Sequence, residues 1–261
     1  MSTDTRGRGK TGWIVGIVAV VAVAALVAVF AFTGSDESDP GATDNTPAAE
    51  RDSAQSSAMD GREWLWPFAN EAEVLEWQRE YREGGHAPWH VDAEATALSF
   101  TTGYLGFAEV DQVVDSTVGD STAEVTVGYV GEGDNASPAA TLLLVRLGSD
   151  DDAPWEVVGT AENDTMTVTE PAPGADVTTP LQVAGMITGV DESIRVQVRD
   201  PDKPTPVADE CCVSAGGENT PWSTTVTFRG PSTSTLTVVA STGGHVAEVE
   251  RFALAGVRPS I

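Results

Sequence analysis

An uninterrupted apolar run at residues 13–32 (WIVGIVAVVAVAALVAVFAF) constrains this chain more than any other feature of its sequence. Its twenty residues carry no charge, and a helix of that length crosses a hydrocarbon core of roughly 30 Å. The run therefore predicts a single transmembrane helix over residues 12–33, with a short tail before it and a large polar portion after it.

The charges on either side of this run predict its orientation. Arg6, Arg8 and Lys10 precede the run, whereas the first basic residue after it is Arg51. Positive charge marks the cytoplasmic side of a membrane helix. We therefore expect a single-pass protein of the cell membrane, with a cytoplasmic tail (residues 1–11) and extracytoplasmic C-terminal domains.

A cleavable signal peptide is the alternative explanation of the same run. Val29 and Ala31 are small enough to precede a cleavage site. Signal peptides, however, use apolar regions of about 7–15 residues and a small-x-small cleavage site. The length of the run favours an uncleaved signal anchor.

The net charge limits the partners of the chain. It has 40 acidic residues against 14 Lys and Arg, a formal net charge of −26. Such a surface repels polyanions, so we expect no nucleic-acid partner. Solubility is the simplest role of this acidity, and attraction of cations or basic partners is the alternative.

The polar portion divides into a linker and two domains. Residues 34–61 contain no aromatic residue and are rich in Ser, Asp, Ala, Thr, Pro and Gly, which predicts a disordered linker. Residues 62–164 show two helical patterns followed by four alternating ones, which indicates an α+β domain of two helices on a four-stranded antiparallel sheet. The helices are expected over 70–84 and 92–106, and the strands over 110–118, 123–130, 139–147 and 155–160.

Two residues mark the helix starts. Asn70, with Glu73 three residues later, has the pattern of a capping box, and Asp92 is expected to cap the second helix. The element order of this domain is similar to the nuclear-transport-factor-two-like class. That resemblance implies a curved sheet around helices, with room for a pocket.

The C-terminal region, residues 165–261, reads as all β. Helical signals are absent there, and short strand-like runs alternate with Pro and Gly, which is typical of a β-sandwich. Seven strands are expected, over residues 166–169, 181–187, 194–198, 206–213, 223–228, 235–240 and 246–254.

The opening of this region resembles a known family. The segment PAPGADVTTPLQVAG (residues 171–185) contains a Pro-x-x-Gly turn and a Pro-Leu-x-Val-x-Gly strand. Together with Glu192 and the aromatic segment at 222–228, it resembles the bacterial spore-germination immunoglobulin-like domain. The resemblance implies an envelope-associated, non-catalytic immunoglobulin-like sandwich, and it does not imply a metal site. Val190 departs from the family pattern, which has an aromatic residue before the glutamate.

Two adjacent cysteines, Cys211 and Cys212, are the only ones in the chain. No disulfide can therefore join distant parts of one chain. Adjacent cysteines could form a vicinal disulfide or pair with another chain; two neighbouring positions without a bond are the simpler expectation.

Aromatic residues form the main candidate interaction surface. Trp64, Trp66, Phe68 and Trp89 lie close together in the sequence, and large rigid aromatic rings suit contacts with glycans or peptides. Trp77 and Tyr81 are expected to fill the core instead.

Two polar clusters contain residue types that bind metal ions. His86, His90 and Asp92 are of types that bind zinc, but Pro88 between them and the expected capping role of Asp92 favour a packed turn. Residues 149–152 (SDDD) lack the ligand spacing of a calcium loop and indicate a solvated hairpin tip. We therefore expect no metal and no cofactor.

The sequence contains no nucleophile elbow, phosphate-binding loop, dinucleotide fingerprint or His-Glu-x-x-His motif. We therefore expect a non-enzymatic binding or scaffolding protein of the bacterial cell envelope, whose partner is an envelope protein or a cell-wall polymer. A small-ligand pocket or an enzyme in the α+β domain is the alternative. A sensor is less favoured, because the tail before the span is too short for a folded output domain.

Overall fold

The structure is a computed structural model, and it describes residues 59, 61–131, 133, 135–229, 232 and 234–260, without the side chains of 190–192. The expected tail (1–11) and span (12–33) lie outside these residues, as does the expected linker (34–61) apart from Met59 and Gly61. None of the helices within the described part has the length and apolar character to cross a membrane.

Helix α2 (Glu71–Gly84) begins and ends where its sequence signals predict. The Asn70 side chain accepts a hydrogen bond from the Glu73 N–H at 3.2 Å, and the Glu73 carboxylate accepts one from the Ala69 N–H at 2.8 Å. Gly85 adopts a left-handed conformation (φ 70°) and ends the helix. Val74 and Trp77 form the buried face of α2.

The second expected helix is divided. A short turn η1 (Pro88–Val91) precedes α3 (Ala93–Leu98), which Asp92 caps through the Ala95 N–H at 2.9 Å. The chain then widens into η2 (Ser99–Tyr104), a π-helical segment. There the hydroxyl of Thr101 donates to the Ala97 carbonyl at 2.8 Å, a side-chain bond of the kind that competes with α-helical pairing.

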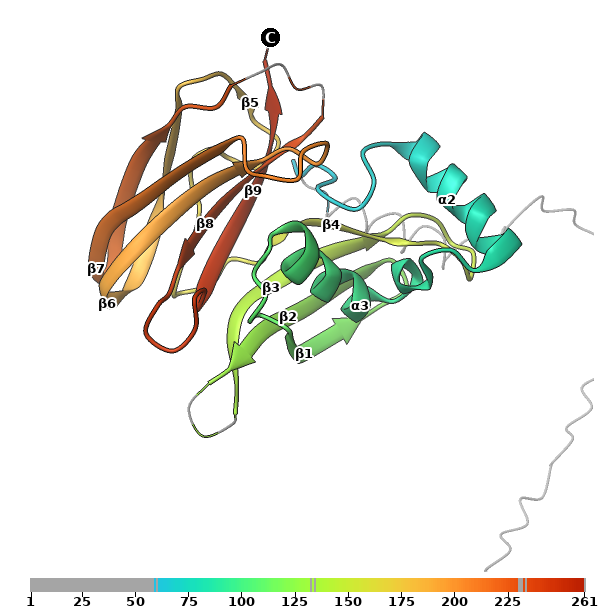
Figure 1. Ribbon diagram of the computed structural model, residues 1–261, viewed down its shortest axis with the longest axis horizontal. Helices are drawn as coiled ribbons and strands as arrows, with labels where there is room; N and C mark the ends of the chain where they lie inside the picture. Colours follow the sequence, from blue (N-terminus) through green and yellow to red (C-terminus); the bar gives the residue numbers. More distant parts are fainter. Residues whose placement is uncertain are drawn as a thin grey trace, which may run out of the picture. The chain divides into compact units, whose positions relative to one another are not determined.

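The expected four-stranded sheet is confirmed. It comprises β1 (Gln112–Val118), β2 (Thr122–Val130), β3 (Ala136–Arg146) and β4 (Trp155–Thr160), antiparallel and in the order β1-β2-β3-β4. Helix α3 packs across all four strands (Figure 1). Helix α2 instead joins a smaller cluster with Phe68 and Leu147.

The C-terminal region forms one five-stranded sheet. Its members are β5 (Asp176–Val177), β6 (Leu181–Arg199), β7 (Ala208–Val226), β8 (Leu236–Thr242) and β9 (Arg251–Pro259), in the order β5-β9-β8-β6-β7. Only the short β5–β9 pair is parallel.

The expectation of seven short strands is wrong, because four of the expected runs belong to two long strands, β6 and β7. The runs at 181–187 and 194–198 both belong to β6, and those at 206–213 and 223–228 largely belong to β7. Turn residues between the runs, such as Gly189 and Gly217, pair across the two strands in shifted register instead of ending them. The run at 166–169 makes only an isolated bridge, between Met166 and Ile187, with a second at Glu170.

The pairing of β6 with β7 changes register between Ile187 and Ile194, and the two halves of β6 on either side of this point contribute to the same core. Side chains from both halves of the strand, including Val183 and Val196, belong to one buried cluster. Trp222 of β7 and Val238 of β8 complete it. The β6–β7 ribbon thus contributes both of its halves to a single hydrophobic core.

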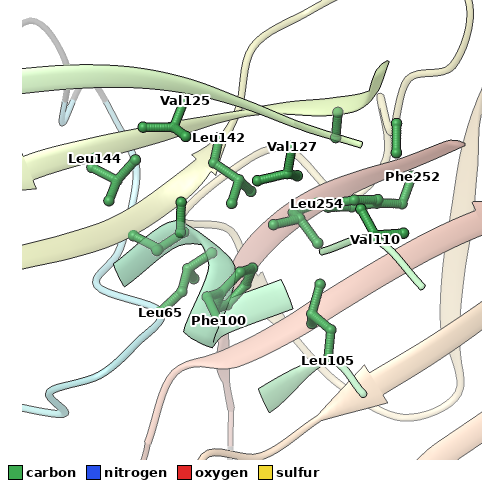
Figure 2. Close-up of a cluster of buried hydrophobic side chains, with 14 of the residues drawn as sticks. Leu65, Phe100, Leu105, Val110, Val125, Val127, Leu142, Leu144, Phe252 and Leu254 are labelled. Atoms are coloured by element: carbon green, nitrogen blue, oxygen red, sulfur yellow. The ribbon is translucent and has the colours of Figure 1, made fainter. Parts of the chain in front are cut away.

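A second cluster joins the two sheets. Val127 and Leu142 of the four-stranded sheet, Phe100 of η2, and Phe252 and Leu254 of β9 belong to the same buried core (Figure 2). Each of the five is at most 6% exposed. The two sheets therefore share hydrophobic packing as well as a chain connection.

Candidate functional site

Two of the four candidate surface residues form an aromatic stack. The rings of Trp66 and Trp89 are nearly parallel, with centroids 5.1 Å apart. The ring of Tyr104 also stacks with that of Trp66, at a centroid distance of 6.3 Å. All three are half-buried, so each ring keeps some contact with solvent. We call Trp66, Trp89 and Tyr104 the aromatic stack.

Three separate elements position this stack. Trp66 lies in an extended segment that bridges to Val157 of β4, Trp89 lies in the turn η1, and Tyr104 ends η2. The hydroxyl of Tyr104 lies 3.4 Å from that of Thr237 in β8, and the Arg199 guanidinium sits 5.8 Å from its ring centroid. Sequence reasoning missed Tyr104 as a surface residue because it falls on the apolar stripe of its helix.

The other two candidates, Trp64 and Phe68, are not part of the aromatic stack. Phe68 is buried, 6% exposed, and packs with Trp77. Trp64 is half-buried against the same small cluster beneath α2. These two residues contribute to packing in the structure.

Two buried ionisable groups lie beneath this region. Glu156 is fully buried; one of its carboxyl oxygens accepts from the Phe68 N–H at 3.1 Å, and the other, Oε1, has no hydrogen-bond partner. Burial raises the pKa of Glu156 well above its usual range. His90 is stacked on Trp89 and lies tilted against Phe68, and its burial lowers its pKa to about 4.

A cleft opens where the segment after η2 faces the five-stranded sheet. It encloses about 310 Å³, a size at the lower end for small-ligand pockets. One wall is formed by residues 105–110. The floor consists of polar side chains that alternate along β6, namely Ser193, Arg195, Gln197 and Arg199.

A hydrogen-bond network fixes this floor. Asp209 of β7 accepts two hydrogen bonds from Arg195, at 2.7 and 2.6 Å, and one from Gln197 at 3.2 Å. Arg199 donates to the carbonyls of Tyr104 (2.7 Å) and Leu105 (2.6 Å). The network therefore connects the cleft floor to the residue that also completes the aromatic stack.

Electrostatics differ along the cleft. The hydrogen bonds from Arg195 hold the pKa of Asp209 below its usual value, and the pKa of Arg195 is raised in turn. Burial lowers the pKa of Arg199. Glu109 and Glu248 also line the cleft, and the Glu109 carboxylate accepts from the Glu248 N–H at 2.7 Å. Cationic and anionic groups are thus both within reach of a bound molecule.

The polar clusters weighed as metal sites have other roles. Asp92 caps α3, and His90 is enclosed by aromatic rings. Asp152 forms an ion pair with Arg82 at 2.5 Å. No group of three or more His, Cys, Asp or Glu side chains within the described part could hold a metal ion.

The interior of the four-stranded sheet differs from an open cone. Phe100 and Leu142, both 0% exposed, fill the space between α3, η2 and the strands. The cleft of about 310 Å³ lies outside this core, against β6 and β8. This cleft is therefore not the pocket that a cone would hold between its helices and its sheet, and the likeness to the cone-like class stays a prediction.

Comparison with known proteins identifies one region of the chain. No curated protein and no solved structure matches the chain. Residues 165–244 match the family model described as the immunoglobulin-like domain of bacterial spore germination. The resemblance predicted from the Pro-Leu-x-Val-x-Gly strand is thereby confirmed: the C-terminal region of this chain is similar, over these residues, to the immunoglobulin-like domain of bacterial spore germination.

Proposed function

We propose that this chain is a membrane-anchored, extracytoplasmic binding or scaffolding protein of the bacterial cell envelope. The anchor is the apolar run within 12–33, with its N-terminus in the cytoplasm, and the linker 34–61 separates it from the folded portion. That portion consists of the α+β domain and an immunoglobulin-like sandwich. The apolar run and the charge asymmetry support the anchor and its orientation, and the match of residues 165–244 to the immunoglobulin-like domain of bacterial spore germination supports the sandwich.

The aromatic stack is the observation that carries the binding role. Trp66 and Trp89 are stacked and half-buried, and the hydroxyl of Tyr104 lies within hydrogen-bond distance of Thr237. Rings held in place lose little side-chain entropy on binding, which is why Trp and Tyr dominate recognition surfaces. A cell-wall polymer or an envelope protein is the proposed partner, and the stack acts by surface complementarity without chemistry.

Co-sedimentation with purified cell-wall sacculi tests this proposal. The full chain, purified in detergent, is compared with Trp66→Ala and Trp89→Ala, and Leu75→Ala serves as control because Leu75 is 59% exposed on α2. We expect each tryptophan variant to bind at least about tenfold more weakly, the scale of a hot-spot residue, and the control to bind like wild type.

Equal binding by all folded variants would contradict the role of the stack. If the wild-type chain ignores sacculi, crosslinking in intact cells with the same variants tests the protein partner. Crosslinks that disappear in both tryptophan variants but persist in Leu75→Ala would support it.

A small-ligand role is the second candidate, and the cleft favours it. Its floor offers the Arg195 guanidinium beside the hydroxyls of Ser193 and Ser241. Thermal unfolding of the full chain with free amino acids and dipeptides measures such binding, since a ligand that binds only the folded state raises the melting temperature. The shift should vanish in Arg195→Ala and persist in Arg79→Ala, a variant on the exposed face of α2.

A further inference from the structure

The two cysteines form a disulfide in an unusual place. Cys211 and Cys212 are bonded to each other within β7. Cys211 lies opposite Arg195 and Val213 lies opposite Ile194, so Cys212 is the extra residue of a β-bulge. Its φ of 151° falls in a region that residues with side chains rarely adopt. The simpler expectation of two neighbouring cysteines without a bond is therefore wrong, and the structure has the vicinal disulfide.

This bond has little to contribute to stability. A disulfide stabilises a fold mainly by closing a loop in the unfolded chain, and the effect decreases as the loop becomes shorter. Adjacent residues close the shortest loop there is. The bond also joins no second strand or sheet, so Cys211–Cys212 is not a structural crosslink.

Its surroundings leave both residues accessible. β7 is the last strand in the order of its sheet, and Cys211 and Cys212 are both exposed. Cys211 also lines the cleft, next to Arg195. Disulfide exchange requires that a thiolate approach one of the sulfur atoms, and an exposed bulge on an edge strand permits that approach.

We propose that Cys211–Cys212 is a thiol–disulfide exchange site, whose reaction partner is a protein dithiol of the thioredoxin type. One thiolate of the partner attacks one Sγ; the Cys211–Cys212 bond breaks, and the released Sγ takes a proton. The second partner thiol then attacks the mixed disulfide and releases the other cysteine, which also takes a proton. The two cysteines gain two electrons and two protons, and the partner becomes a disulfide.

The exchange has a consequence for the cleft. Reduction removes the bond that holds Cys212 in its bulge. Cys211 and Cys212 lie two and three residues after Asp209 in the sequence. Asp209 holds Arg195 and Gln197 in the cleft floor, so the redox state of the pair affects the order of that floor. We expect faster amide exchange at residues 208–213 in the reduced protein, with the four-stranded sheet unchanged.

Thiol alkylation followed by intact mass tests the proposal on the full chain, purified in detergent without reductant. We expect no alkylated cysteine, even in denaturant, before reduction. After treatment of the folded protein with reduced thioredoxin we expect two alkylated cysteines per chain and an unchanged circular dichroism spectrum. Cys212→Ser is the matched control, with one cysteine alkylated at once and no thioredoxin oxidised.

Three outcomes would overturn the proposal. Free thiols in the untreated protein would show that the bond does not form. A dimer on a non-reducing gel that disappears with reductant would show pairing between chains. Reduction by thioredoxin only after the protein is unfolded would show that the bond is not an exchange site. None of these outcomes depends on whether sacculi are bound.

Discussion

At the scale of single residues, burial decides the chemistry of the two ionisable groups beneath the aromatic stack. Glu156 and His90 are both less than 10% exposed, at 0% and 6%. Each is favoured in its neutral form, because burial penalises charge. The pKa of Glu156 is consequently raised and that of His90 is lowered, so the two groups make stability depend on pH in opposite directions.

Glu156→Gln is expected to stabilise the protein at pH 7 and above. The folded state binds the proton of Glu156 more tightly than the unfolded state does, so stability present below about pH 4.5 is lost as the pH rises. The amide keeps an acceptor for the Phe68 N–H without a titrating proton. We expect a gain of about 1–3 kcal/mol in the free energy of unfolding, measured by urea titration at pH 5, 7 and 8.5. Glu124→Gln, at an exposed position of β2, should change nothing; a loss of stability in Glu156→Gln at every pH would contradict the prediction.

His90 is expected to weaken the fold in acid. Its pKa of about 4 lies below the ordinary value of 6.5, so the unfolded chain binds a proton first. The stability is complete above pH 6.5 and is lost as the pH falls toward 4, by up to about 3 kcal/mol. Urea titrations between pH 7 and 4 should show a shallower pH dependence for His90→Phe than for wild type, whereas Leu75→Ala, at a position 59% exposed on α2, should retain the wild-type slope.

At the scale of elements, the close approach of the 166–170 segment to β6 explains a glycine of the family motif. The Thr167 N–H donates to the Met186 carbonyl at 3.0 Å, and Thr169 donates to Ala184 at 2.8 Å. Between these contacts lies Gly185, opposite Trp222 of β7. A β-carbon there would lie 1.8 Å from the Thr167 carbonyl oxygen and 2.9 Å from the Trp222 ring. The motif therefore ends in Gly because backbone occupies the space of a side chain.

Gly185→Ala is expected to destabilise the C-terminal sheet. The backbone of Thr167 cannot move aside as a flexible side chain could, so the cost should be at least the about 1–3 kcal/mol typical of overpacking. The midpoint of urea unfolding measures it. Gly84→Ala is the control, since a β-carbon there meets no atom within 4 Å. Equal midpoints for Gly185→Ala and wild type would show that the segment separates from β6 easily.

At the scale of the whole described portion, β9 belongs to both cores, as does the neighbouring strand β8 through Val238 and Val239. Ala253, Ala255 and Val257 pack into the core of the five-stranded sheet, whereas Phe252 and Leu254 pack against the four-stranded sheet. The alternation of side chains along a strand sends neighbours to opposite faces. One strand can thereby connect two hydrophobic cores, which favours their unfolding together.

Phe252→Ala is expected to weaken both sheets at once. Phe252 is fully buried and meets Phe107 edge-on at 5.4 Å; removing such a ring costs about 3–5 kcal/mol. Amide exchange should accelerate in β2 as well as in β8. Val246→Ala, at a position 50% exposed, should leave both unchanged. Faster exchange in β8 alone would show that the two sheets unfold independently.

Local signals in the sequence determined the helices and strands between residues 70 and 160. Capping by Asn70 and Asp92, the helix end at Gly85 and the apolar runs of β2 to β4 depend on neighbours in the chain, and these were predicted correctly, whereas the division of the second helix into α3 and η2 was not. The family of the C-terminal region also followed from a short motif, because its Pro and Gly residues have fixed backbone roles. The tertiary structure decided the features that depend on residues far apart. Pairing in shifted register continues β6 and β7 through their glycines. Tertiary packing buries Phe68 and leaves Trp66 and Trp89 half-buried. The cleft lies where residues 105–110 meet strands that are distant in the sequence. Such contacts reward a chain only once it has folded, so no local pattern of residues specifies them.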